Sequence, residues 1–146
     1  MDAESTPSPL FKGFYEMLVE SVRDYKGDFK EVVKLTPEIF KLFTNLLEDP
    51  LVPASGKPII NAAIAYFVAP FDALPEEVYG PVGYLDDLFL ATWALKKLEE
   101  IVGYAVLENN WEGEEELSTV IDEVHRRTKA VISEVEEDIL DYVGLR

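Results

Sequence analysis

Five carboxylates lie in or beside the most apolar part of the chain, and they are its best candidates for chemistry. They are Asp72, Glu76, Glu77, Asp86 and Asp87. Burying a charge is costly unless it is paired or hydrogen-bonded, so acids in such surroundings need a local purpose. Several carboxylate oxygens that converge on one point suit Mg²⁺ or Ca²⁺. A hard-cation site is therefore one interpretation of this segment.

Two apolar segments position these acids. Residues 58–69 open on a proline and are apolar almost all round, which is typical of a helix buried on all sides. Residues 84–108 are apolar on most sides and form the second predicted helix. A short connection makes the two helices antiparallel neighbours, so the end of the first lies near the start of the second. The hairpin end then gathers Tyr66, Asp72, Glu76, Tyr84, Asp86 and Asp87.

The two adjacent aspartates should differ in burial. Successive residues on a helix point about 100° apart. Asp87 shares its face with small apolar residues, whereas Asp86 shares a more amphipathic face. We therefore expect Asp87 to be the more buried, and it then needs donors. The Tyr66 hydroxyl, backbone N–H groups of the loop at 70–83 or a metal ion could supply them.

Three interpretations of the acids stay open. In the first, they hold the loop, because Asp is favoured in the first turn of a helix and Asp72 can accept backbone N–H bonds in a turn. In the second, they bind Mg²⁺ or Ca²⁺. In the third, the loop is a recognition surface for a partner. The cation site would consist of Asp72, Glu76, Asp86 and Asp87.

The remaining sequence predicts amphipathic helices. Apolar residues recur at spacings of three and four over 11–32, from Pro37 to about Asp49, and over 114–142. Gly27 interrupts the first pattern, so residues 11–32 could form one helix or two. Thr36 is the expected N-cap of the next helix. After a flexible tail at 1–8, we expect a single all-α domain over 9–146. Helices from both ends of the chain would wrap the buried antiparallel hairpin.

Composition narrows the function classes. A net charge of −16 over 146 residues makes nucleic acid a poor partner and disfavours anionic membranes. The chain has no Cys, so disulfides and thiolate zinc sites are excluded. The chain has few thermolabile residues and many Glu and Lys residues, a composition that is typical of hyperthermophile proteins. No signal peptide or apolar run of spanning length is visible, which predicts a cytoplasmic protein. His125, the only histidine, is expected to be solvated or at a rim.

The hairpin segment resembles a known family. It reads Tyr66-Phe-Val-Ala-Pro-Phe-Asp-Ala-Leu-Pro-Glu76 and then Gly83-Tyr-Leu-Asp-Asp-Leu88. This is similar to the YkvA-like domains of unknown function, over about residues 37–100. The shared motif comprises Tyr66, Pro70, Asp72, Pro75, Gly83, Tyr84, Asp86 and Asp87, and Glu76 stands where the family commonly has Asp. The resemblance implies a helical domain, sometimes found in proteins near membranes, with no established activity.

These observations favour a non-enzymatic interaction or scaffold module over an enzyme, because no nucleophile lies at useful spacing from a base. The apolar stripes at both ends of the chain could serve a homodimer or a protein partner. The alternative is a divalent-cation-binding protein or hydrolase that uses Asp72, Asp86 and Asp87, assisted by Glu76. A further alternative is peripheral association with a membrane through the apolar hairpin.

Overall fold

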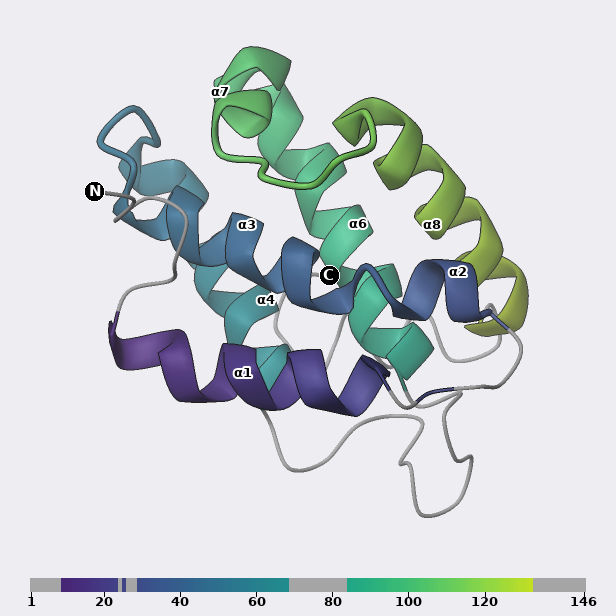
Figure 1. Cartoon of the computed structure of the whole chain (residues 1–146). Helices are drawn as coiled ribbons and strands as arrows, with labels where there is room; N and C mark the ends of the chain where they lie inside the picture. The colour runs from purple at the N-terminus through teal and green to yellow at the C-terminus, as the bar shows by residue number, and fades with distance from the viewer. Residues whose placement is uncertain (1–8, 24, 26–28, 69–83, 133–146) are drawn as a thin grey trace.

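The computed structural model describes residues 9–23, 25, 29–68 and 84–132. Within these ranges the secondary structure is helical and contains no strand, which confirms the all-α prediction. The predicted tail at 1–8 and the end of the last predicted helix lie outside them. The described elements are α1 (Pro9–Arg23), α2 (Lys30–Val33), α3 (Thr36–Glu48), the 3₁₀ turn η2 (Ala54–Gly56), α4 (Lys57–Val68), α6 (Tyr84–Val102), α7 (Tyr104–Asn109) and α8 (Leu117–Ile132) (Figure 1).

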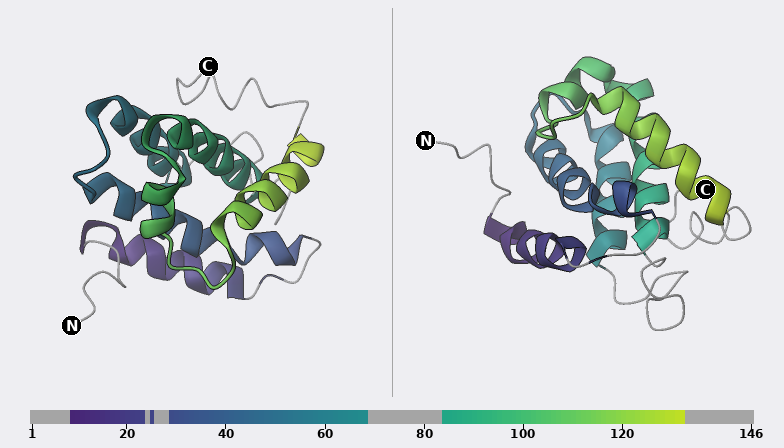
Figure 2. Two further views of the ribbon diagram at one scale, coloured as in Figure 1. Left: turned by 90° about the horizontal axis from the view of Figure 1, so that it is seen from above. Right: turned by 45° about the vertical axis from the view of Figure 1, so that its right-hand side comes forward.

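Helix α6 is the centre of the bundle. Every residue from Leu85 to Thr92 is buried, so this part of the helix has no face toward solvent. α6 packs against α8 on one side and against α4 on another (Figure 1). Figure 2 shows α1 and α8 on different sides of the bundle, with α1 against α3. The helix α8 therefore covers the central helix α6 directly, whereas α1 packs on α3.

Helices α4 and α6 run antiparallel. Tyr66 near the end of α4 is hydrogen-bonded to Asp86 in the first turn of α6. Gly56, immediately before α4, lies against Leu98 near the other end of α6, where an added Cβ would come within 3.3 Å of the leucine Cδ2 atom. The C-terminal end of α4 therefore lies beside the N-terminal end of α6, and the N-terminal end of α4 lies beside the C-terminal part of α6. The connecting residues 69–83 lie outside the described part of the chain.

Helix α4 is not buried on all sides, and this expectation was wrong. Its exposed residues follow the spacing of a single helix face, namely Pro58, Asn61, Ala65 and Val68. The other side of the helix packs on α3 and α6. The exposed residues other than valine are small or polar, so leaving this face in water sacrifices little apolar burial. An apolar sequence therefore did not require a neighbour on every side.

Local sequence signals predicted some helix ends correctly and others incorrectly. Arg23 ends α1 before α2 begins, so the first amphipathic segment contains two helices. Thr36 does not act as a side-chain N-cap; its hydroxyl donates instead to the Val33 carbonyl at 2.8 Å. The long helix expected over 84–108 is divided at Gly103, whose φ of 87° is incompatible with helix continuation. None of the described helices is long and apolar enough to cross a membrane.

Candidate functional site

Asp86 is the best-positioned of the predicted acids. It lies in the first turn of α6 and is fully buried. The hydroxyl of Tyr66, also buried, donates to its Oδ2 atom at 3.0 Å. The backbone N–H of Asp87 donates to its Oδ1 atom at 2.8 Å. Both carboxylate oxygens therefore accept hydrogen bonds from the protein, and one of these bonds joins α4 to α6.

The expected order of burial was wrong. Asp86 is 0% exposed and Asp87 is 9% exposed, and the Tyr66 hydroxyl bonds Asp86 rather than Asp87. The sequence argument used the neighbours of each aspartate within its own helix. Burial is set instead by the adjacent helix, because Asp86 faces the side chain that α4 presents. The loop-holding interpretation had anticipated a carboxylate in the first helical turn, and Asp86 occupies that position.

Only part of the predicted cation site lies within the described residues. Asp86 and Asp87 are neighbours there, whereas Asp72 and Glu76 fall in the range 69–83, as do Pro70, Pro75 and Gly83 of the shared motif. In the described ranges no three His, Asp or Glu side chains come together as metal ligands would. The four-carboxylate site for Mg²⁺ or Ca²⁺ therefore stays a prediction.

A second polar cluster surrounds Lys41, and sequence reasoning missed it. Lys41 on α3 is 7% exposed, and its Nζ atom lies 3.2 Å from the Glu112 carboxylate. The same Nζ lies 5.1 Å from the centre of the Tyr15 ring on α1. Asn45 donates to Glu112 at 2.9 Å and to the Asn110 carbonyl at 3.0 Å. The cluster ties α1 and α3 to the segment after α7, and its only sequence signal was one cation in an otherwise apolar and acidic helix.

Burial perturbs two acids of this cluster. Desolvation raises the pKa of the Glu38 carboxyl, and the nearby Lys41 charge only partly offsets this. Desolvation likewise raises the pKa of the Tyr15 phenol, with a further contribution from the Glu38 charge. Perturbed pKa values occur in active sites and also in structural ion-pair networks. Here the lysine is already engaged by Glu112, which favours a structural network.

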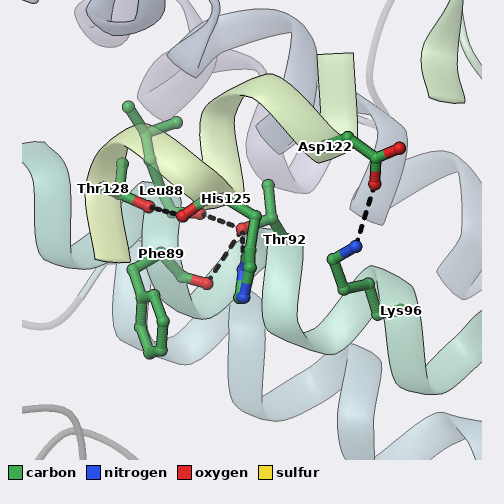
Figure 3. A network of polar contacts seen from close by, with 7 residues as sticks. All are labelled: Leu88, Phe89, Thr92, Lys96, Asp122, His125 and Thr128. Carbon is green, nitrogen blue, oxygen red and sulfur yellow. Dashed lines mark hydrogen bonds and ion pairs between the residues drawn. The ribbon is translucent and has the colours of Figure 1, made fainter. Parts of the chain in front are cut away.

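His125 joins α8 to the centre of the bundle (Figure 3). It is half-buried rather than solvated, and its ring stacks on Phe89 with centroids 5.2 Å apart. Its Nδ1 atom lies 3.0 Å from the Thr92 hydroxyl oxygen, which is also 3.1 Å from the carbonyls of Leu88 and Phe89. When the single hydroxyl proton goes to a carbonyl, the hydroxyl oxygen can accept from Nδ1–H. The Thr92 hydroxyl lies within hydrogen-bond reach of an imidazole but is 0% exposed, so it is shielded from a substrate and the contact positions α8 on α6.

A narrow groove of about 300 Å³ separates α2 from α8. Its apolar lining includes Val32, Val120 and Val124, which are between 0 and 2% exposed. These valines therefore offer almost no apolar surface to a ligand. The charged residues at its rim include both signs, Glu123 and Arg127 among them. We therefore do not identify this groove as a ligand site.

Comparisons with known proteins place the chain among uncharacterised relatives. The family model described as "Protein of unknown function (DUF1232)" matches residues 57–93, which span α4 and the first half of α6. That segment contains both Tyr66 and Asp86. The chain is 31% identical over 126 residues to the "Uncharacterized protein ORF9" of Methanothermobacter thermautotrophicus, covering 86% of each protein. No solved structure matches significantly. The chain therefore belongs to the family of this ORF9 protein and carries a DUF1232 domain of unknown function.

Proposed function

We propose that this protein is a non-enzymatic interaction module in which the acids of the hairpin are structural. The observation that carries this proposal is the environment of Asp86. Its carboxylate is fully buried and accepts from both the Tyr66 hydroxyl and the Asp87 amide. A carboxylate in this state fastens α4 to α6 and is shielded from any substrate in solution.

Lys41 and His125, two further polar residues of the described part of the chain, support the same role. The ion pair of Lys41 and Glu112 joins α3 to the segment after α7, and the contact between His125 and Thr92 joins α8 to α6. In each contact one polar atom is engaged by the protein and joins elements that are distant in sequence. Buried polar groups satisfied in this way specify one arrangement of a core. A partner would then be bound by the protein surface rather than by these buried groups. The relationship to the YkvA-like domains over 37–100 is part of this proposal and rests on the motif from Tyr66 to Leu88.

Calorimetric titration with Mg²⁺, Ca²⁺ and Mn²⁺ tests the proposal against the cation alternative. We expect no saturable heat with the wild-type protein, and we expect Asp86→Asn to lower stability only. Asp87→Asn is the control for stability, because it neutralises the adjacent carboxylate that Tyr66 does not bond. Asp87 is also a ligand of the predicted cation site, so this variant should lose binding as well if that site exists. Saturable binding that Asp86→Asn abolishes would instead establish a cation-dependent protein.

A further inference from the structure

Helix α1 is attached to the bundle through a small interface. Its main neighbour among the described helices is α3, and Figure 2 shows α1 on the outside of the bundle. Of residues 11–23, only Leu18 is buried. α1 has 15 residues with Gly13 among them, and an isolated helix of about this length is marginal in water. α1 therefore depends on its contact with α3, and elements with few buried apolar contacts are those that open locally.

The contact between α1 and α3 has an apolar part and a polar part. In the apolar part, the ring centres of Phe11 and Phe14 lie 5.9 and 5.0 Å from that of Phe40, which is 0% exposed. In the polar part, the centre of the Tyr15 ring lies 5.1 Å from the Lys41 ammonium. The apolar part holds α1 in the same way at any pH, whereas the polar part contains groups that can titrate.

Glu38 belongs to the polar part of this contact. It is half-buried on α3, three residues before Lys41. The charged and titratable groups around it are Tyr15 from α1, Lys41 from α3, and Glu112 and Glu114 from the segment after α7. Lys41 is the single cation among them, and its Nζ atom already lies 3.2 Å from the Glu112 carboxylate. Two carboxylates therefore share one ammonium group, which leaves a negative charge uncompensated at a site with little water.

We propose that α1 is a proton-linked cover on α3: its docking takes up a proton at Glu38, so α1 is held more tightly in acid and is released more readily as the pH rises. Docking places Tyr15 beside this acid and removes water from it, which disfavours the charged form. Desolvation raises the pKa of the Glu38 carboxyl, the Lys41 charge partly offsets this, and the Glu112 charge adds to it. Release of α1 returns water to Glu38. This coupling does not depend on which partner the protein binds.

The direction of the pH effect follows from that of the shift. A carboxyl whose pKa is raised in the docked state stabilises docking below the ordinary glutamate range, and this contribution is lost as the pH rises through the raised pKa. Tyr15 does not titrate in this window, because burial raises the pKa of its phenol further above neutrality. We therefore expect α1 to dock more tightly at about pH 5 than at about pH 8.

Hydrogen exchange of the whole protein, followed by mass spectrometry and corrected for the intrinsic pH dependence of amide exchange, tests this coupling. Released α1 loses its helix, so the protection of its backbone amides reports docking, whereas the amides of α6 report global unfolding. α1 should be less protected than α6 at both pH values, because it opens separately. Its protection should rise by about two- to fivefold from about pH 8 to about pH 5.

Three variants assign the effect to its group. Glu38→Gln carries no charge at either pH, so α1 should be protected equally at both, within about 1.5-fold. Glu48→Gln is the matched control, because Glu48 is exposed on the same helix and its replacement changes the net charge equally; the wild-type response should persist. Glu112→Gln leaves Lys41 to compensate Glu38, so the response should become weaker. Circular dichroism verifies that each variant is folded.

Each outcome decides for or against the proton-linked cover. A response of α1 that Glu38→Gln abolishes and Glu48→Gln retains supports the proposal. Protection of α1 that does not change with pH overturns it, and so does a response that persists in Glu38→Gln. Equal protection of α1 and α6 at both pH values also overturns it, because α1 would then not be released separately. A response confined to α8 would point to His125, the only histidine, and would count against Glu38.

Discussion

Replacing Tyr66 with Phe removes one hydroxyl from the contact between α4 and α6. That hydroxyl donates to Asp86 at 3.0 Å, and the two residues are 1% and 0% exposed. Water cannot readily replace the lost donor, and the acceptor is a carboxylate. Hydrogen bonds to charged groups contribute about 1.5–3 kcal/mol. We therefore expect Tyr66→Phe to lower the free energy of unfolding by about that amount, or Tm by about 3–12 °C for a chain of this size.

Urea denaturation followed by circular dichroism measures this loss, provided that the m-value is unchanged. Tyr104→Phe is the matched control. The Tyr104 hydroxyl accepts from the Ser118 amide at 3.0 Å, a part-buried contact between neutral groups. A neutral hydrogen bond contributes about 0.5–1.5 kcal/mol. Tyr66→Phe should therefore be clearly the more destabilising of two chemically identical substitutions.

A double-mutant cycle with Asp86→Ala, which removes both acceptor oxygens, isolates the pair itself. Residues in direct contact show coupling energies of about 0.5–3 kcal/mol, and the Tyr66–Asp86 pair should lie in the upper half of this range. Two results would refute the reasoning. One is a coupling energy near zero, and the other is a Tyr66→Phe loss no larger than that of Tyr104→Phe. Either would mean that the hydroxyl does not stabilise the Asp86 carboxylate in solution.

Two further predictions concern the backbone and pH. Gly103→Ala should destabilise the protein by about 1–3 kcal/mol, whereas Gly13→Ala inside α1 should stabilise it by about 0.5–1 kcal/mol. An added Cβ atom meets nothing within 4 Å at either site, so the two substitutions differ mainly in the φ of 87° at Gly103. Thermal denaturation of both variants measures this difference. Glu38→Gln should be more stable than wild type near neutral pH, because desolvation raises the pKa of this carboxyl and so penalises its charged form in the folded state. This advantage should disappear as the pH falls below the ordinary glutamate range, where Glu38 is neutral in both states; an advantage that grew in acid would contradict the assignment.

The elements of the fold could be predicted where local chemistry and periodicity agree. The expected helix from Pro37 to about Asp49 corresponds to α3, because a proline at its start and an Asp-Pro step at its end are local signals. The end of α6 was missed although Gly103 was visible, because the apolar pattern continues past it into α7. Periodicity reports which residues face a core, and it does not report a single residue with positive φ.

The contact between Tyr66 and the first turn of α6 could be predicted from the sequence, whereas the four-carboxylate site stays a prediction. Antiparallel connectivity alone brought Tyr66 to Asp86, since both lie at the same end of the hairpin. Which of Asp86 and Asp87 is the more buried depends on the side of α6 against which α4 packs. The sequence pattern of α6 does not specify that side. The pair of Lys41 and Glu112 is harder still, because nothing local to either residue names a partner so distant in sequence.

A buried Asp86 is not explained by stability alone. Replacing a buried polar pair with well-packed apolar residues is often neutral or stabilising. The alternative benefit is register, since apolar contacts between α4 and α6 could be remade after a shift of one helical turn. The hydrogen bond from Tyr66 to Asp86 forms only when the end of α4 meets the start of α6. We therefore interpret this pair as the feature that selects one alignment of the two central helices. The same alignment determines which residues of α4 remain exposed.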